Sequence, residues 1–363
     1  MRIALVAPLV APIREPQRGG SQAFVSDLAR GLIDRGHDVH LYAASGSDVP
    51  GVRLVDAGVD PEALGVTLYR PDGTVGNDAP AESAFASVYS AVGDHRYEIV
   101  HNHAFDAPAI TLAASLDAPV VHTLHLPPDQ AVAGALREVM RTDPSPTLAG
   151  VSAFQVRAWR RLFPVDAILS PCIPTALVDW SPDPGEGAVF AGRLSPEKGV
   201  AEAIDIAKAA GVGIDVYGDV YDADYARTRI EPRRSEHGIS LHQAVPRSAL
   251  WDRMARASVV LCPARWEEPF GMVAADAQAC GTPVVAFDRG ALGEVIVDEV
   301  TGFLVPPDDV RAATHAVQRV GELSRSECRA HAERRLDLQR SLDAHEQLYG
   351  RLVWTAAGAA AGG

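Results

Sequence analysis

Short apolar runs alternate with amphipathic segments along nearly the whole chain, and this alternation is the feature that most limits its fold. The first run, RIALVAPLV, precedes the segment SQAFVSDLARGLIDRG, in which Phe24, Leu28 and Leu32 recur at helical spacing. We expect Ser21 to cap this helix and Gly36 to end it. Strands and helices repeated in this order predict a parallel sheet covered by helices on both faces.

The alternation forms two series. Further strands of the first series are expected in HDVHLYAA, EIVHNH, PVVHTLH, TLAGVS and AILSP, and residues 172–187 then indicate a linker rich in Pro, Gly and Asp. The second series comprises AVFAGR, GIDVYGD, ISLHQAV, SVVLCPA, PVVAFD and GFLVP. We therefore expect two doubly wound α/β domains, at residues 1–180 and 181–334. A long helical stretch follows from about Ser324, and its last part, about 335–355, could pack back onto the first domain.

Length and charge narrow the functional classes. The 363 residues exceed one ordinary hydrophobic core and suit two domains. The formal net charge of -14 argues against general nucleic-acid binding, because no basic excess exists to neutralise phosphates. The same charge weakens docking on an anionic membrane surface without excluding it.

Cysteine usage and the apolar runs indicate the compartment. The four cysteines lie far apart without a C-x-x-C spacing, which favours reduced thiols over a disulfide framework or a zinc site. The opening MRIALVAPLVAP has one arginine and a short apolar run, which suit a buried first strand better than a signal peptide. No other stretch approaches the length needed to span a bilayer. We therefore expect a soluble, cytoplasmic protein.

Two basic side chains follow the first strand of the second series. Arg193 stands at the end of AVFAGR, and Lys198 precedes a helix that we expect to begin near Gly199. Lys198 and Lys208 are the only lysines in the chain, so a lysine inside a motif is informative. A guanidinium group, an ammonium group and free helix-start amides together suit a diphosphate. A solvated turn with two surface cations is the alternative.

The stretch EEPFGMVAADAQACGTPVV carries carboxylates at a separation that suits an extended ligand. Asp276 lies about 12 Å beyond Glu268 at ordinary helical rise, too far for the two groups to share a proton. They could instead accept hydrogen bonds from hydroxyls at two parts of one ligand. Pro269 suits the first turn of a helix, and Gly271 leaves room for a ligand to approach the backbone. For Glu267, an ordinary acidic position near a helix N-terminus is the better interpretation.

Histidines gather in the first series, at the ends of two expected strands: His101, His103, His122 and His125. The H-x-H spacing of the first pair also occurs in metal hydrolases. A metal site would need carboxylates or further histidines that converge on the same point. Packing near strand ends is the plain alternative, which we expect for two of the four.

Two loops contain glycines that favour close approach of the backbone to a ligand. Gly19 and Gly20 end the loop after the first strand, where they permit positive φ angles, although a simple turn is the alternative. They do not form a G-x-G-x-x-G pattern, so we infer no NAD binding. The segment GALGE, which ends at Glu294, could cradle phosphate with its backbone amides. The acidic DAD at 222–224 indicates a solvated face rather than a metal motif.

Taken in order, these motifs resemble the family-4 glycosyltransferases, whose fold is called GT-B. The resemblance covers nearly the whole chain and includes the GG before the first helix, HNH, HTLH, VSAFQVRAW, GRLSPEKG, EEPFGMVAADAQACGTPVV and GALGEVIVDEVTGFLVPPDD. Each motif alone is weak, but the combination in this order is specific. The implied fold is two Rossmann-like domains that face each other across a cleft.

The resemblance assigns roles to individual positions. Arg193 and Lys198 match the residues that bind the donor diphosphate, and Glu268 matches the glutamate that contacts the donor sugar. Asp276 stands where the family usually has a second glutamate that contacts the ribose, so this contact could shift or pass through water. His125 lies in a turn that faces the donor sugar in the family, which makes it a catalytic candidate together with Glu268. The remaining candidates are Gly19, Gly20, Phe270 and Gly271 for the donor, and His103 and Glu294 as weaker positions.

The function that the resemblance implies is retaining transfer of a hexose-like sugar from a nucleotide diphosphate sugar to an acceptor hydroxyl, without a metal or other cofactor. The acceptor could be a saccharide, a lipid-linked molecule or a natural product. Three alternatives stay open: a sugar-nucleotide 2-epimerase of similar architecture, a metal-dependent hydrolase built on the histidines, and a binding protein that has lost catalysis.

Overall fold

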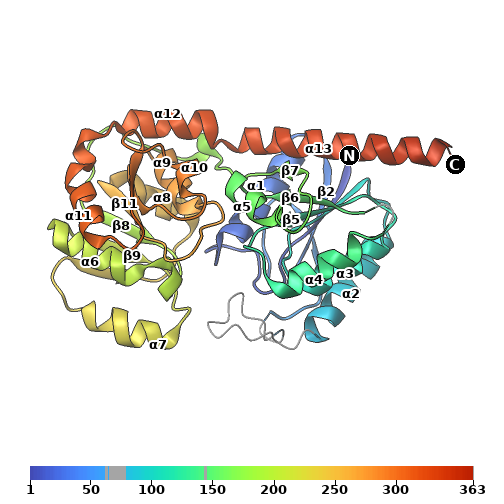
Figure 1. Cartoon of the computed structure of the whole chain (residues 1–363), viewed down its shortest axis with the longest axis horizontal. Helices are drawn as coiled ribbons and strands as arrows, with labels where there is room; N and C mark the ends of the chain where they lie inside the picture. The colour runs from blue at the N-terminus through green and yellow to red at the C-terminus, as the bar shows by residue number, and fades with distance from the viewer. Residues whose placement is uncertain (62–63, 65–78, 143–144, 363) are drawn as a thin grey trace. The chain divides into compact units, whose positions relative to one another are not determined.

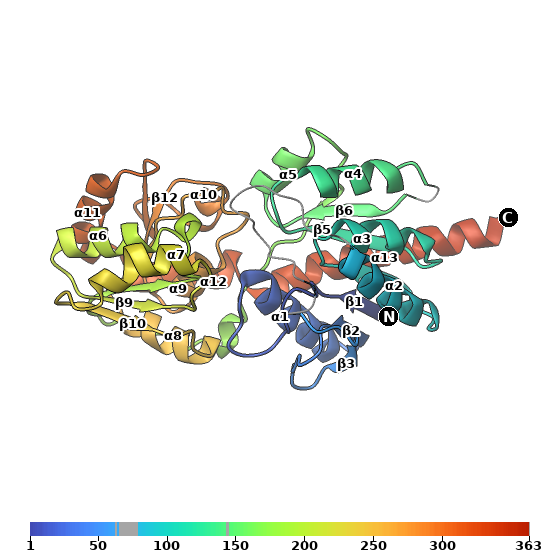
Figure 2. The ribbon, with the colours of Figure 1, turned by 90° about the horizontal axis from the view of Figure 1, so that it is seen from below.

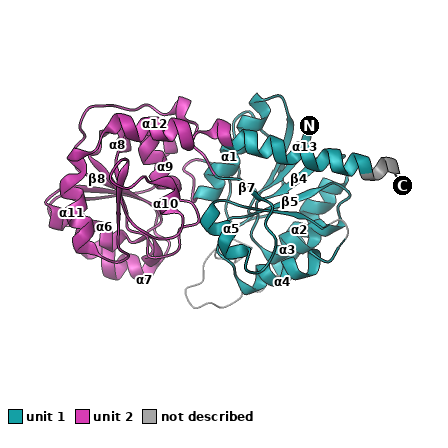
Figure 3. Cartoon of the chain, turned by 45° about the horizontal axis from the view of Figure 1, so that its top comes forward, with its two compact units in different colours: residues 1–14, 20–170, 341–363 teal, residues 15–19, 171–340 magenta. Residues whose placement is uncertain are grey.

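The structure, a computed structural model, describes residues 1–61, 64, 79–142 and 145–362. The chain divides into two compact units, shown in different colours in Figure 3. Unit 1 comprises residues 1–14, 20–170 and 341–363, and unit 2 comprises residues 15–19 and 171–340. In the described part of the chain, no helix is both long and apolar enough to span a membrane.

Unit 1 contains a seven-stranded sheet in the order β3-β2-β1-β4-β5-β6-β7, with every pair parallel. Its strands are β1 (Arg2–Val6), β2 (Asp38–Ala43), β3 (Arg53–Asp56), β4 (Ile99–Asn102), β5 (Val120–Leu124), β6 (Thr147–Gly150) and β7 (Ala167–Ile168). Six of the seven lie in runs that the sequence predicts. The edge strand β3 was not predicted, because its four residues are only partly buried and carry no clear alternation.

The described helices within residues 20–170 of unit 1 are α1 (Gly20–Asp34), α2 (Ala79–Gly93), α3 (Ala107–Thr111), α4 (Gln130–Val139) and α5 (Ala153–Trp159), with a short 3-10 turn η1 (Leu112–Ser115). The predicted cap at Ser21 is wrong: α1 already begins at Gly20, and the Ser21 hydroxyl donates to the side chain of Gln22 instead. The predicted end is confirmed, since the helix stops at Asp34 and Gly36 follows with a φ of 84°.

The last helical stretch is broken. Instead of one helix from about Ser324, the chain forms α12 (Arg325–Arg335) and then α13 (Leu338–Gly362), as Figure 1 shows. The break occurs because the backbone of residues 336–338 bonds to Ile173, which donates to the Leu336 carbonyl and accepts from the Leu338 amide. Beyond residue 340, α13 belongs to unit 1, where Leu342 fits against Gly31 of α1 so closely that a Cβ at Gly31 would lie 2.7 Å from it.

Unit 2 contains a six-stranded sheet in the order β10-β9-β8-β11-β12-β13, again entirely parallel. Its strands are β8 (Ala188–Ala191), β9 (Ile214–Tyr217), β10 (Ile239–His242), β11 (Val259–Cys262), β12 (Val284–Phe287) and β13 (Gly302–Val305), all predicted from the sequence. Figure 2 shows α6 (Val200–Ala210) on one face of this sheet and α8 (Arg247–Arg256) on the other.

The remaining helices of unit 2 are α7 (Ala223–Tyr225), α9 (Met272–Ala279), α10 (Leu292–Val295) and α11 (Val310–Arg319). The unit also contains the 3-10 turns η2 (Thr175–Leu177), η3 (Pro196–Lys198), η5 (Glu231–Arg233) and η6 (Val320–Glu322), and a π-helical turn, η4 (Ala226–Ile230). One continuous core joins apolar residues of α6 and α11 to the inward faces of the strands. Helix α6 begins directly after Gly199. This position requires glycine, because a Cβ there would lie 1.9 Å from the Pro263 carbonyl oxygen.

Both sheets reverse their strand order at one position. In unit 1 the reversal lies between β1 and β4, and in unit 2 it lies between β8 and β11. Open parallel sheets bind ligands beyond the carboxyl ends of the strands at such reversals, because the connections there diverge to opposite faces. The loops after these four strands are therefore where a ligand site is expected.

Candidate functional site

At the reversal in unit 2, the loops after β8 and β11 bring Lys198 and Glu268 together. The Lys198 ammonium lies 2.8 Å from Oε2 of Glu268 and 4.7 Å from the centre of the Trp266 ring. The indole Nε1 of Trp266 donates to the same Glu268 oxygen at 2.8 Å. Both charged side chains keep some contact with solvent, with exposed fractions of 22% and 16%. Trp266 thus contacts both members of the pair, which remains partly exposed to solvent.

Arg193 lies in the loop after β8. Its guanidinium carbon lies 4.5 Å from the centre of the Tyr221 ring, and one nitrogen approaches Glu197 at 3.4 Å. Glu197 also accepts a shorter bond of 2.6 Å from the hydroxyl of Ser195. The long contact with Glu197 leaves the guanidinium able to turn towards an anion, because a bidentate arginine–carboxylate pair would be shorter and planar.

Asp276 lies on α9, and its side chain contacts two residues of α8. Its Oδ1 accepts from Nε and an NH2 nitrogen of Arg247, at 3.2 and 2.9 Å, and from Nε1 of Trp251 at 2.8 Å. The two charged side chains are 7% and 9% exposed, so this is a buried ion pair. The structure therefore assigns Asp276 a structural contact with α8, which the sequence did not indicate.

The loop that carries Glu268 is fixed to the loop before α10. Glu267 accepts from the Gly290 amide at 2.8 Å, and the Glu268 carbonyl accepts from the Ala291 amide at 2.8 Å. The interpretation of Glu267 as a helix-start acid is therefore wrong. The predicted phosphate cradle in GALGE is not formed by the amides of residues 290–292 or Glu294, because each donates to a protein oxygen.

Helix α9 begins later than predicted. Gly271 is its N-cap, with a φ of 104°, and the first helical residue is Met272. Pro269 therefore lies before the first turn, and its predicted place inside that turn is wrong. The left-handed backbone of Gly271 is the physical reason, because a residue in that conformation cannot continue a right-handed helix. Phe270 is buried beside it, whereas Glu294 is exposed on α10.

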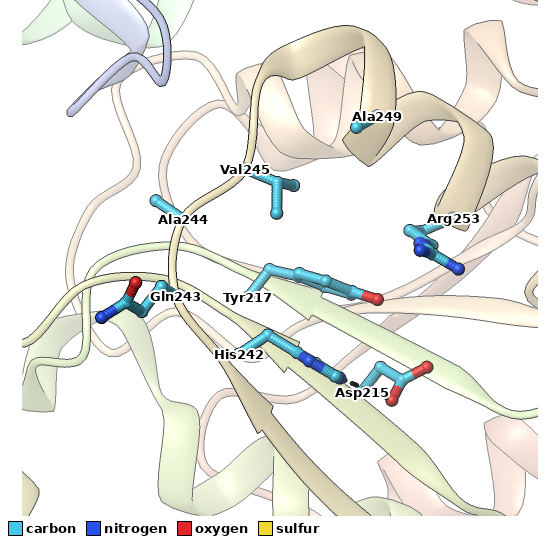
Figure 4. Close-up of a pocket in the computed structure, with 8 residues that line it drawn as sticks. All are labelled: Asp215, Tyr217, His242, Gln243, Ala244, Val245, Ala249 and Arg253. Atoms are coloured by element: carbon cyan, nitrogen blue, oxygen red, sulfur yellow. Dashed lines mark hydrogen bonds and ion pairs between the residues drawn. The ribbon is translucent and has the colours of Figure 1, made fainter.

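A cavity of about 490 Å³ lies along the same edge of the unit 2 sheet, at the ends of β9 and β10 (Figure 4). The Tyr217 ring stacks on His242 with 4.6 Å between ring centres, and His242 Nε2 lies 3.1 Å from an oxygen of Asp215. Burial, and then the nearby carboxylate of Asp215, raise the pKa of Tyr217. The other lining residues come from the β10–α8 loop and from α8: Gln243, Ala244, Val245, Ala249 and Arg253. The sequence did not predict this cavity, although Tyr217 and His242 each end a predicted strand.

In unit 1, the histidines after β4 and β5 form a buried pair. His103 Nδ1 lies 3.1 Å from His125 Nε2, and the two residues are 0% and 7% exposed. Burial lowers the pKa of His125 to about 3, and it also lowers the pKa of His103 well below its ordinary value. Both imidazoles are therefore neutral at physiological pH.

His101 and His122 have structural partners, as the plain alternative predicts. His101 lies 2.5 Å from the Tyr349 hydroxyl of α13 and 2.6 Å from the Thr123 hydroxyl. His122 Nδ1 lies 3.0 Å from the side-chain amide of Asn102. Among the described residues, no three His, Cys, Asp or Glu side chains form a group that could hold a metal ion.

Gly19 ends the segment after β1 that belongs to unit 2, and Gly20 is the first residue of α1 in unit 1. Neither is among the glycines of the described chain with a positive φ. The conformational freedom that the sequence suggested for these two residues is therefore not used in this structure.

Family models match both halves of the chain. Residues 18–176 match the model described as Glycosyltransferase Family 4, and residues 181–335 match Glycosyl transferases group 1. The chain is 29% identical to a D-inositol 3-phosphate glycosyltransferase of Xylanimonas cellulosilytica, covering 85% of each chain. It is 26% identical to a phosphatidyl-myo-inositol mannosyltransferase of Mycolicibacterium smegmatis, covering 91% of this chain and 86% of the relative. The solved sucrose-phosphate synthase of Thermosynechococcus elongatus has a TM-score of 0.80 at 19% identity, over 98% of this chain and 99% of that one.

Proposed function

Because the chain belongs to the family-4 glycosyltransferases and has their GT-B fold, we propose that it is a retaining enzyme that needs no metal. The proposed reaction moves a sugar from a nucleotide diphosphate sugar to an acceptor hydroxyl. The observation that carries the proposal is the Lys198–Glu268 pair, which lies at the strand-order reversal of unit 2 with both groups partly exposed. A cation for the diphosphate and an acceptor for sugar hydroxyls are thereby side by side.

The proposed diphosphate site uses Arg193 and Lys198. An ammonium group has three donors, so Lys198 can hold Glu268 and still donate to a phosphate oxygen. Arg193 supplies a planar guanidinium, and its carboxylate contact among the described residues, to Glu197, is long. In a retaining reaction by front-face attack, the leaving diphosphate gains negative charge, and these two cations would stabilise it. No covalent enzyme intermediate is needed for this step.

The proposed sugar contact is Glu268. Lys198 and Trp266 both reach Oε2, and no hydrogen bond from a described residue reaches Oε1. This second oxygen can accept from a sugar hydroxyl while the first stays anchored. For unit 1, we propose that His125 contacts the donor sugar, as the resemblance to the family implies.

The nucleobase is assigned to the cavity at β9 and β10. Strands β8, β9 and β10 are neighbours in the sheet, and adjacent strands lie about 4.8 Å apart. A nucleotide whose phosphates lie after β8 can therefore reach β9 and β10 along the same edge. One face of Tyr217 is covered by His242, and Figure 4 shows Val245 and Ala249 beyond its other face. A planar base would fit between these groups by stacking.

The relatives suggest which acceptors to test first. The names of two of them refer to inositol 3-phosphate and phosphatidyl-myo-inositol. Inositol phosphates are therefore the first acceptors for a transfer assay, ahead of other saccharide, lipid-linked or natural-product hydroxyls. Incubation with the donor alone separates transfer from 2-epimerisation, because an epimerase would form a new sugar nucleotide without any acceptor.

A thermal-shift panel of nucleoside diphosphates and their sugars, with and without chelator, tests the proposal. Binding stabilises the native state by mass action, so about 2.7 kcal/mol is expected at a ligand concentration 100 times Kd. Lys198→Ala should abolish the shift, and Tyr217→Ala should weaken binding about tenfold. Lys208→Ala is the matched control, because Lys208 is the only other lysine and is exposed. Equal losses from both lysine variants, or a shift that requires metal, would contradict the assignment.

A further inference from the structure

His103 carries a buried nitrogen that the proposed reaction does not use. Its Nδ1 faces Nε2 of His125 at 3.1 Å, whereas its Nε2 has no hydrogen-bond partner and the residue is 0% exposed. The backbone fixes the ring's place, because the His103 amide donates to the Val6 carbonyl at 2.8 Å at the end of β1. Such an unpartnered buried polar atom needs an explanation.

The surroundings of the pair leave few arrangements of protons. Phe24 of α1 packs against both rings, with centres 5.6 Å from His103 and 6.0 Å from His125. The His101 ring lies 4.0 Å from that of His103, but both nitrogens of His101 already face the hydroxyls of Tyr349 and Thr123. His345 of α13, also buried, is a further titratable side chain near the cluster. Among the described residues, no carboxylate contacts the pair.

Two neutral imidazoles can share this hydrogen bond in two ways. If His125 donates from Nε2, the proton of His103 lies on Nε2 and becomes a buried N–H without a partner. If His103 donates from Nδ1, its Nε2 carries only an unpaired acceptor. Orphaned buried N–H groups are rarer than under-satisfied acceptors, which favours the second arrangement. In that arrangement the proton of His125 must be on Nδ1.

We propose that His103 is a positioning residue: its Nδ1–H donates to Nε2 of His125 and holds His125 in the tautomer that presents an Nδ1–H. His125 then acts as a neutral hydrogen-bond donor towards a ligand oxygen and does not act as a general base. The tautomer is a property of unit 1 alone. The identity of the acceptor, an oxygen of the donor sugar, rests on the proposed function, because only that function places a donor sugar at His125.

Nitrogen-15 NMR of the protein labelled at histidine tests the tautomer without any ligand. At neutral pH, His125 should show a protonated Nδ1 and a bare Nε2, with its signals assigned by their loss in His125→Ala. His103→Leu should give a mixture of tautomers at His125. His103→Asn should restore the wild-type tautomer, because its side-chain amide can place an N–H near the position of Nδ1. A protonated Nε2 in the wild type, or an unchanged tautomer in His103→Leu, would overturn the proposal.

Steady-state kinetics of the His103 variants test the positioning role a second time. His103→Leu should lower kcat/KM about tenfold, and His103→Asn should recover most of the loss. His122→Asn is the matched control, because His122 is equally buried but bonds Asn102 instead of His125. It should leave the His125 signals unchanged, and a change there as large as in His103→Leu would contradict the proposal. If the expected tautomer is seen but no sugar is transferred, the proposed function fails while the positioning role stands. If His103→Leu does not fold, the wild-type and His103→Asn spectra still decide.

Discussion

The two units carry opposite kinds of polar groups at the carboxyl ends of similar parallel sheets. Unit 1 has neutral histidines, with His103 and His125 bonded to each other and almost fully buried. Unit 2 has charged pairs, of which Lys198–Glu268 is partly exposed and Arg247–Asp276 is buried. The stability that depends on neutral buried histidines is insensitive to salt but is lost in acid. Exposed charges, in contrast, respond to ligands and to salt. Under the proposed function, the edge of unit 1 orients the ligand and the edge of unit 2 binds its anionic group.

The largest expected effect is on turnover, at the charged edge. Glu268→Gln keeps the shape of the side chain but removes the charge that holds Lys198, so kcat should fall about 100-fold or more. The measurement is an initial-rate assay with the donor identified by thermal shift. Glu267→Gln is the neighbouring control, since Glu267 bonds the Gly290 amide and not Lys198. If both substitutions cost the same, the loop as a whole matters rather than the Glu268 carboxylate.

A large effect on stability is expected at the buried pair of unit 2. Asp276→Ala removes the Asp276 carboxylate from the buried Arg247 guanidinium, which should lower the free energy of unfolding by about 3–5 kcal/mol. Urea unfolding of wild type and variant measures this difference. A loss below about 1 kcal/mol would show that the ion pair is not structural. Asp276 would then be a residue kept mainly for a ligand, as the family pattern implies.

The smallest expected effect is a pH dependence that belongs to unit 1. Burial lowers the pKa of His345 and of His122 to about 4, below the ordinary value near 6.5. The unfolded chain therefore binds more protons below pH 6.5, so stability is fully present above that pH and is lost as pH falls towards 4. Each such histidine contributes up to about 1.4 kcal/mol per pH unit in this window.

Substitution of one buried histidine isolates this effect. Between pH 7.5 and 5, the free energy of unfolding of His345→Leu should fall less steeply than that of the wild type. The difference in slope should correspond to about one proton fewer taken up on unfolding. His315→Leu is the control, because His315 is exposed on α11 of unit 2. Equal slopes for wild type and His345→Leu would mean that the buried histidines do not set the acid sensitivity of the protein.

Much of this architecture could be predicted because apolar periodicity reports burial directly. Of the thirteen strands in the described part of the chain, twelve lie in runs expected from the sequence. The strand β3 was missed because an edge strand of four residues buries too little to show a pattern. Local signals failed where a tertiary contact decided the outcome. The break before α13 depends on Ile173, which lies more than 160 residues away in the sequence.

The site was only partly predictable for the same reason. Residue type and position after a strand pointed to Lys198 and Glu268, which the fold does bring together at 2.8 Å. The indole of Trp266, which anchors Glu268, and the arginine that occupies Asp276 gave no signal. Hydrogen bonds between side chains on separate elements leave no periodicity, so they become visible only with coordinates.

The most direct test of the account is a crystal structure of the protein with the nucleoside diphosphate that the thermal-shift panel selects. We expect the two phosphates to contact Arg193 and Lys198 and the base to lie against Tyr217 at the ends of β9 and β10. A nucleotide bound elsewhere, with Lys198 and Glu268 still paired only to each other, would contradict it.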